Sequence, residues 1–216
     1  MNAVQYLSVA LLPLVFAITL HEAAHGWVAN RLGDPTARLQ GRLSFNPLRH
    51  IDPVGTILVP MALLLLSGFI FGWAKPVPVD TRNLRHPRRD MALVALAGPG
   101  ANLLMAIAWG LVGRLAFMLP ASLAWAAVPL ALMGKIGLFL NLILMVLNLL
   151  PLPPLDGSRV LAWLLPPRAA EWLDRIEPYG ILILLGLLYL GLWQKLIGPL
   201  TTLLAALLQT WLGLKG

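Results

Sequence analysis

The sequence of 216 residues contains no cysteine, so it can form no disulfide and offers no thiolate to a metal ion. It also contains few charged residues, which make up 12% of the chain, where roughly 25% is usual for a soluble domain. Apolar residues make up 59%. This composition excludes an ordinary soluble domain. It predicts an all-α polytopic integral membrane protein with five to six apolar segments of roughly 20 residues each.

The net charge of +7 does not indicate a nucleic-acid-binding protein, because the basic residues lie in short stretches between apolar runs. In such stretches they are expected to set the orientation of the chain in the membrane. The stretch 31–52 is short and basic, which predicts that it is cytoplasmic and that the amino terminus lies outside. We therefore expect a multi-pass protein of the inner (plasma) membrane, in contact with the lipid bilayer and with no nucleic-acid partner.

One short motif in an apolar stretch carries the candidate chemistry, His21-Glu22-Ala23-Ala24-His25. If residues 4–32 form one helix, His21 and His25 lie one turn apart on the same face, where both can bind one zinc ion. Glu22 then lies beside the metal as a candidate general base. Ionisable residues are costly in an apolar segment, so a functional role is expected for all three.

A zinc ion held by two histidines needs a third protein ligand and an open position for water. Of the nine acidic residues, only Glu22 and Asp156 have apolar or proline-interrupted apolar surroundings. Asp156 is therefore the candidate third ligand. An Asp-Gly pair is also a common turn dipeptide, so local chemistry leaves both interpretations open. His50 and His86 lie in basic stretches and are expected to be ordinary loop residues.

The apolar run 53–73 has basic residues on both flanks. A full crossing would place one basic flank outside, against the positive-inside tendency. A re-entrant hairpin that turns at Pro60 or Gly68 keeps both flanks inside, and it is favoured here over a full span. The stretch 72–79 contains two prolines and predicts an extended segment that can pair on one edge only.

Long helices are predicted over about 89–119 and 130–150, and prolines 151, 153 and 154 break the second of them. A polar connector, 166–178, leads to the apolar segments 179–195 and 197–214. The first of these can span the membrane once, and the second spans or lies at the interface. Asn102 and Asn148 lie in the two long helices, where interhelical hydrogen bonds are the simplest role for asparagine.

Three motifs together resemble those of the site-2 protease family of intramembrane zinc metalloproteases. They are HEAAH at 21–25, AGPGAN at 97–102 and NLLPLPPLDG at 148–157. The resemblance implies that Asp156 is the third ligand, beside His21 and His25, of one zinc ion per chain. It implies that Glu22 is catalytic.

The resemblance also implies a catalytic role for Asn148, which would orient the substrate carbonyl or stabilise the oxyanion. For Asn102 it implies a structural role in helix packing close to the site. It further implies a short membrane-associated β-hairpin or loop ahead of the AGPGAN helix, a position that 72–79 matches. This segment could hold an unwound substrate by strand addition.

The chain resembles a minimal form of the family, without a PDZ insert or a CBS-like tail. A single protease domain, 1–216, is expected, with a catalytic core at about 4–165 and gating or packing helices at about 178–214. The implied activity is hydrolysis of peptide bonds within or near transmembrane segments of membrane-anchored proteins, such as an anti-sigma factor or a similar regulator. The active site would lie toward the cytoplasmic side. The alternative is a catalytically inactive or metal-binding membrane scaffold of the same fold.

Overall fold

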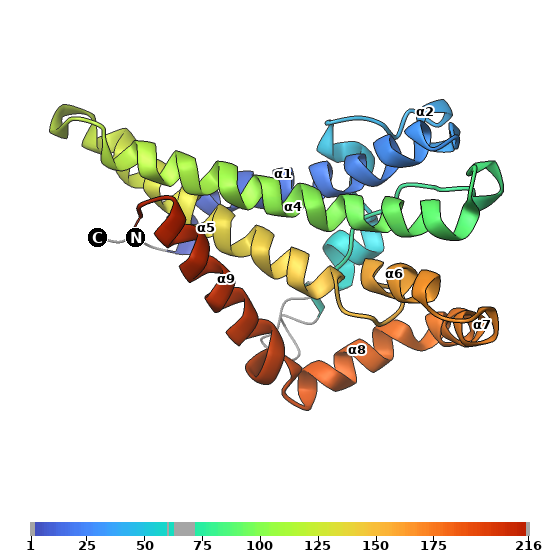
Figure 1. Cartoon of the computed structure of the whole chain (residues 1–216). Helices are drawn as coiled ribbons and strands as arrows, with labels where there is room; N and C mark the ends of the chain where they lie inside the picture. The colour runs from blue at the N-terminus through green and yellow to red at the C-terminus, as the bar shows by residue number, and fades with distance from the viewer. Residues whose placement is uncertain (1–2, 60, 63–71, 215–216) are drawn as a thin grey trace.

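The computed structural model describes residues 3–59, 61–62 and 72–214, and every regular element in these ranges is a helix. The prediction of an all-helical fold is confirmed for this part of the chain. The three longest helices are α1 (Ala3–Arg31), α4 (Pro87–Phe117) and α5 (Ala124–Asn148). They run side by side and form the body of the molecule, with α4 in contact with both of the others (Figure 1).

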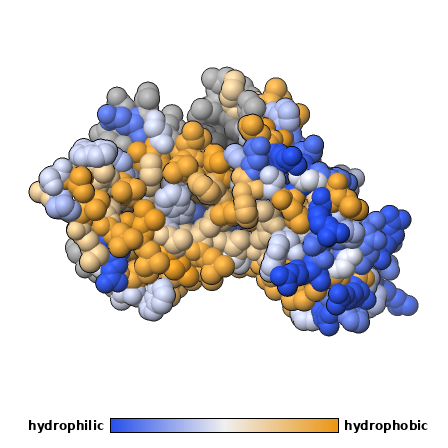
Figure 2. Space-filling model, turned by 90° about the horizontal axis from the view of Figure 1, so that it is seen from above, coloured by the Kyte–Doolittle hydropathy of each residue, from blue (hydrophilic) through white to orange (hydrophobic). Residues whose placement is uncertain are grey.

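Three helical stretches in the described ranges are long and apolar enough to cross a membrane: Ser8–Arg31, Pro87–Phe117 and Ala121–Asn148. A fourth candidate is the pair Pro167–Tyr189 and Trp193–Trp211, which meet at an angle of 72°. On the face seen in Figure 2, hydrophobic residues predominate over the body, and hydrophilic residues gather at the end that carries α2 (Thr36–Leu39). These helices indicate a membrane protein.

Three or four candidate spans are fewer than the five to six apolar segments expected from the sequence, for two reasons. The run 53–73 begins as a short π-helical turn, η2 (Pro53–Leu58), and its predicted turn residues Pro60 and Gly68 lie outside the described residues. The last two apolar segments are shorter helices, α8 (Gly180–Tyr189) and α9 (Gly198–Trp211), joined at a sharp bend. Gly191 at this bend has a φ of +95°, a conformation that favours glycine.

The segment 72–80 forms neither helix nor strand, so the described residues contain the predicted loop and no β-hairpin. Its backbone is nevertheless bonded to the rest of the protein. The N–H of Trp73 donates to the carbonyl of Gly55 at 3.0 Å, and the N–H of Lys75 donates to the carbonyl of His50 at 2.9 Å. These bonds hold the segment against the stretch that follows α1.

Two short helices at the hydrophilic end, α6 (Asp156–Leu164) and α7 (Pro167–Ile176), are fixed by arginines. Arg159 of α6 donates to Asp174 of α7 at 3.0 Å. Arg88 of α4 donates to two carbonyls at the end of α6, at 2.8 and 2.6 Å. Because α6 begins at Asp156, these bonds also fix the position of that carboxylate.

Candidate metal centre

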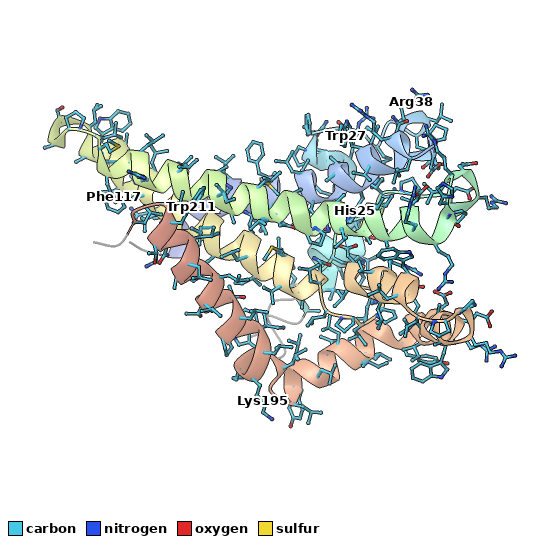
Figure 3. All side chains as sticks on the ribbon, viewed as in Figure 1. His25, Trp27, Arg38, Phe117, Lys195 and Trp211 are labelled. Atoms are coloured by element: carbon cyan, nitrogen blue, oxygen red, sulfur yellow. The ribbon has the colours of Figure 1, made fainter. Side chains whose placement is uncertain are left out.

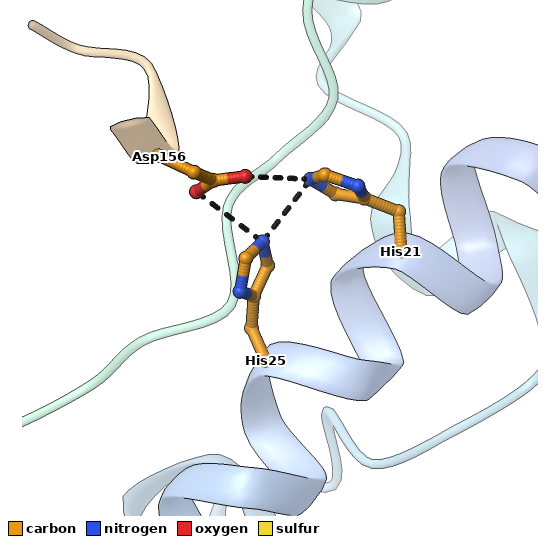
Figure 4. Close-up of side chains that lie close together, drawn as sticks. All are labelled: His21, His25 and Asp156. Carbon is orange, nitrogen blue, oxygen red and sulfur yellow. Dashed lines mark hydrogen bonds and ion pairs between the residues drawn. The ribbon is translucent and has the colours of Figure 1, made fainter. Parts of the chain in front are cut away.

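Three side chains from distant parts of the sequence meet at one point (Figure 4). The Nε2 atoms of His21 and His25 are 3.1 Å apart, and the carboxylate of Asp156 lies 3.3 Å from the first and 3.4 Å from the second. The histidines occupy successive turns of α1, and Asp156 is the first residue of α6. The structure thus brings together the three residues that the sequence predicts as metal ligands.

A hydrogen bond on the far side of each imidazole determines which ring nitrogen carries the proton. His25 Nδ1 lies 2.7 Å from the backbone carbonyl of Val94, which can only accept, so Nδ1 donates. His21 Nδ1 lies 2.5 Å from Oδ1 of Asn102 and donates to it. In the neutral form of each histidine, Nε2 is then left with a lone pair that faces the cluster.

A chain of amides sets the direction of the bond at His21. Asn141 Nδ2 donates to the carbonyl of Gly137 at 2.8 Å, so its Oδ1 is left to accept from Asn102 Nδ2 at 2.9 Å. Asn102 must therefore present its own Oδ1 to the histidine. Both asparagines are fully buried. Such outer partners fix the tautomer and the ring orientation of histidine ligands.

The donor set fits a zinc ion. The two Nε2 lone pairs face each other and the carboxylate of Asp156, whose Oδ2 is buried without a hydrogen-bond partner. Three acceptors without a donor between them are unfavourable in an apolar interior unless a cation lies among them. Two imidazole nitrogens, one carboxylate oxygen and an open fourth position are typical of catalytic zinc.

Asp156 reaches the histidines through a tight turn after α5. A Cβ on Gly157 would collide with the backbone carbonyls of Leu149 and Leu150, so this close approach requires glycine. The Asp-Gly pair thus forms a turn and also presents a carboxylate to the cluster. Burial raises the pKa of the Asp156 carboxyl, but hydrogen bonds and positive charge from protonated imidazoles of His21 and His25 lower it by more, to about 2. The carboxyl is therefore ionised at neutral pH, as a metal ligand must be.

The AGPGAN motif lies against both imidazoles. Val94, Gly98 and Asn102 recur at intervals of four residues and line one stripe of α4. Val94 and Asn102 bond to His25 and His21, and a Cβ on Gly98 would collide with both rings. The motif therefore lets α4 approach closely enough to hold the histidines, a more direct role than the packing role expected for Asn102.

Glu22 is held by the extended segment. One oxygen of its carboxylate, Oε2, accepts from the backbone N–H of Val77 at 2.9 Å. The carboxylate also lies close enough to His25 to interact with it electrostatically. The sequence-predicted general base is therefore beside the cluster and oriented by the loop that follows the run 53–73.

Asn148 stands apart from the cluster. Its Nδ2 donates to the carbonyl of Leu144, one turn earlier in its own helix, at 3.0 Å. None of the hydrogen bonds of the described residues joins it to the three candidate ligands, so its catalytic role remains a prediction. His50 is buried against the carbonyl of Ser44, and His86 is exposed at the start of α4. Neither belongs to the cluster.

Sequence reasoning missed Gly98 and Asn141. Asn141 had a visible signal, since it is a polar residue in the middle of an apolar helix, where such residues tend to be functional. Gly98 had no signal beyond its motif, because the lack of room for a side chain becomes visible only when the two helices are packed together.

The cluster lies inside the bundle and toward the hydrophilic end. Figure 3 shows His25 beside α4, far from Phe117 and Trp211 at the opposite end. Arg31 lies six positions after His25, which is about 9 Å of helix. Trp27 is 55% exposed and lies against the guanidinium of Arg31, whose carbon is 4.7 Å from the ring centre. Such a pair is typical of a membrane interface. The fold and the site together define a helical membrane metalloprotein.

Comparison with known proteins defines the family. The chain is 39% identical over 206 residues to "Putative zinc metalloprotease YwhC" of Bacillus subtilis (strain 168), a match that covers 93% of this chain and 91% of that protein. It is 34% identical over 175 residues to "Putative zinc metalloprotease Rip2" of Mycolicibacterium smegmatis, covering 81% of this chain and 64% of the relative. It is also 34% identical over 169 residues to Rip2 of Mycobacterium tuberculosis (strain H37Rv), covering 78% and 62%.

No family model and no solved structure matches the chain. The chain belongs to the family of zinc metalloproteases that these relatives represent. The prediction of zinc as the cofactor is confirmed by this family together with the donor set of the cluster.

Proposed function

We propose that the chain is an intramembrane zinc endopeptidase of the site-2 protease type, which hydrolyses peptide bonds within or near transmembrane segments of membrane-anchored proteins. The observation that carries this proposal is the position of the cluster. His21 and His25 lie on a helix that is apolar enough to cross a membrane, and Asp156 joins them from the short helix α6, which follows the apolar helix α5. A peptidase site built there would meet substrates in the bilayer.

In the proposed mechanism His21, His25 and Asp156 hold the zinc ion. When bound, zinc lowers the pKa of a water molecule toward neutrality and polarises a carbonyl. Glu22 takes the proton of the attacking water as general base and passes it to the leaving amine. The Val77 N–H keeps the carboxylate of Glu22 oriented for this transfer.

Asn148 is proposed to orient the substrate carbonyl or to stabilise the oxyanion through its amide. This role requires its Nδ2 to exchange the carbonyl of Leu144 for the substrate. The residue lies at the end of α5, directly before the turn that leads to Asp156, and so close in sequence to the cluster.

The segment 72–80 is proposed to bind the substrate by strand addition. The N–H groups of Trp73, Lys75 and Val77 all bond to the protein, and in an extended chain those of the intervening residues face the opposite edge. On that edge Pro76 and the following Pro78 are prolines, which cannot donate. An extended substrate would therefore pair mainly by donating its own N–H groups to carbonyls of this segment other than those of Lys75 and Pro76, which accept from Arg42. Such pairing requires the substrate helix to unwind.

We place the run 53–73 as a re-entrant hairpin and the cluster toward the cytoplasmic side of the inner membrane. The two ends of the run lie together. Trp73 N–H donates to Gly55 at 3.0 Å, and Thr56 Oγ1 donates to the carbonyl of Trp73 at 2.9 Å. This closure supports a return to the same side, and the basic flanks support a cytoplasmic side. The bent pair α8–α9 would act as gating or packing helices of a single protease domain.

The proposed substrate is a membrane-anchored regulator, such as an anti-sigma factor. The other candidate function, an inactive or metal-binding scaffold of the same fold, is not favoured, because the candidate ligands and Glu22 are all in place. It predicts zinc binding without hydrolysis, so a single variant separates the two.

The test is Glu22→Gln in the full chain, reconstituted in liposomes with a model protein anchored by one transmembrane helix. We expect one zinc ion per chain, as in the wild type, and cleavage reduced by about 10²–10⁴-fold, the usual contribution of a general base. Glu171→Gln makes the same change at an exposed position on α7 and should leave cleavage unchanged. Unchanged cleavage by Glu22→Gln, or no cleavage by the zinc-loaded wild type, would overturn the proposal.

A further inference from the structure

Arg42 is a buried cation that has no anionic partner in the described part of the chain. It is 9% exposed, and its guanidinium forms no ion pair with any carboxylate of the described residues. Its Nη2 donates instead to the backbone carbonyls of Lys75 at 2.8 Å and Pro76 at 3.3 Å, and its Nε is buried without a partner. Burial of an unpaired charge is costly, so the position calls for an explanation beyond packing.

The second carbonyl belongs to the same peptide group as the N–H that binds Glu22. The C=O of Pro76 accepts from Arg42, and the N–H of Val77, on the other side of that amide, donates to Glu22 Oε2 at 2.9 Å. A cation at the carbonyl and a carboxylate at the N–H polarise the amide in the same direction. Each therefore strengthens the hydrogen bond of the other.

Packing holds this peptide group against α1. Val77 is 8% exposed, and a Cβ on Gly26 would lie 2.9 Å from its Cγ1 and 2.6 Å from Cδ2 of Leu43. Gly26 follows Glu22 by one turn, so the segment lies against the part of α1 from which the carboxylate projects. Leu43 is the neighbour of Arg42 in the chain. The arginine, the peptide group and the carboxylate are thus fixed to one another.

We propose that Arg42 is a positioning residue for Glu22, which acts through the Pro76–Val77 peptide group to fix the orientation of the carboxylate during proton transfer. This inference rests on the proposed function, in which Glu22 is the general base. Arg42 makes no hydrogen bond to His21, His25 or Asp156 among the bonds of the described residues. Its loss is therefore expected to leave zinc binding intact and to slow the chemical step.

The experiment compares Arg42→Met, Arg42→Gln and the control Arg38→Met in the full, zinc-loaded chain. Arg38 is exposed in the same stretch, so its replacement removes the same charge. We expect kcat to fall by about 10–100-fold in Arg42→Met, part of the 10²–10⁴-fold that a general base contributes, with KM and zinc content unchanged. Arg42→Gln keeps N–H donors but loses the charge, so its kcat should lie between those of Arg42→Met and the wild type. Arg38→Met should match the wild type.

Two further measurements separate positioning from a general loss of structure. Hydrogen exchange at the amide of Val77 should become faster in Arg42→Met, while exchange in α4 and α5 stays unchanged. In a Glu22→Asp background, whose shorter side chain cannot keep the bond to Val77, Arg42→Met should cause no further loss of kcat. If Arg42→Met does not fold, the same comparisons apply to Arg42→Gln.

Wild-type kcat in the Arg42 variants, or a loss that multiplies with that of Glu22→Asp, would overturn the proposal. The outcome for Glu22→Gln tells the two proposals apart. If Glu22→Gln loses cleavage but the Arg42 variants do not, only the role of Arg42 is wrong. If Glu22→Gln cleaves normally, the proposed function itself is wrong.

Discussion

The metal cluster and the bent pair α8–α9 are held in place by different kinds of contact. At the cluster, each candidate histidine ligand donates a directed hydrogen bond from Nδ1. His25 donates to the carbonyl of Val94, and His21 donates to Asn102, which is held in turn by Asn141. In the bent pair and the turn that joins its helices, Leu184, Ile197 and Ala205 are buried, and the last two belong to the apolar core. Directed bonds fix angles and proton positions, whereas apolar burial fixes only proximity.

Because of this difference, we expect the two regions to tolerate substitutions differently. Small changes around the cluster should affect zinc binding and catalysis strongly, although they remove few atoms. Changes of the same size in the bent pair should have little effect where the added atoms meet open space, as at Gly186, but not at Gly180, where a Cβ would collide with the backbone of Pro153.

Gly98→Ala should reduce zinc affinity by about a hundredfold or more and reduce cleavage in proportion. The added methyl group would collide with both imidazoles, which cannot withdraw without losing their bonds to Val94 and Asn102. Gly100→Ala is the matched control, because a Cβ there meets nothing within 4 Å. It should keep full activity. Zinc titration with a competing chelator measures both, and equal affinities would contradict the close approach of α4.

Asn102→Ala should reduce zinc affinity by about 10–100-fold, the usual effect of losing an outer partner of a histidine ligand. Asn141→Ala should have a smaller effect in the same direction, because it acts only through Asn102. Asn148→Ala should leave zinc affinity unchanged and lower only kcat. The same titration, combined with cleavage rates, distinguishes the three variants. A larger loss of zinc affinity for Asn141→Ala than for Asn102→Ala would contradict the hydrogen-bond order His21–Asn102–Asn141.

Gly186→Ala in α8 should change the free energy of unfolding by no more than about 0.5–1 kcal/mol, in the stabilising direction. A Cβ there meets nothing within 4 Å, and alanine has the higher helix propensity. Zinc affinity and kcat should match the wild type. A loss of activity in this variant would show that the bent pair is fixed more strictly than its apolar contacts suggest.

The candidate ligands could be predicted from the sequence because each depends on local information. His21 and His25 are joined by the period of one helix, and Asp156 is an acidic residue in a proline-interrupted apolar stretch that also matches a family motif. Two of the groups that hold them are the backbone carbonyl of Val94 and the missing side chain of Gly98. Neither of these two leaves a chemical signal in the sequence, in contrast to Asn102 and Asn141.

The helical fold could likewise be predicted from apolar runs, but the number of spans could not. Composition and length do not distinguish one straight span from two short helices that meet at 72°. The role proposed for Arg42 could not be predicted from the sequence either. In the sequence it is one of several arginines in a basic stretch, and only the fold places it against the peptide group that binds Glu22.

The central claim, a zinc ion held by His21, His25 and Asp156, is tested most directly by zinc content and X-ray absorption at the zinc edge. The account predicts one zinc ion per chain, bound by two imidazole nitrogens and by oxygen atoms at about 2.0–2.2 Å. His21→Ala should lose the metal, and His86→Ala, at an exposed position, should keep it. Zinc that remains at one ion per chain in His21→Ala, or is lost in His86→Ala, would contradict the account.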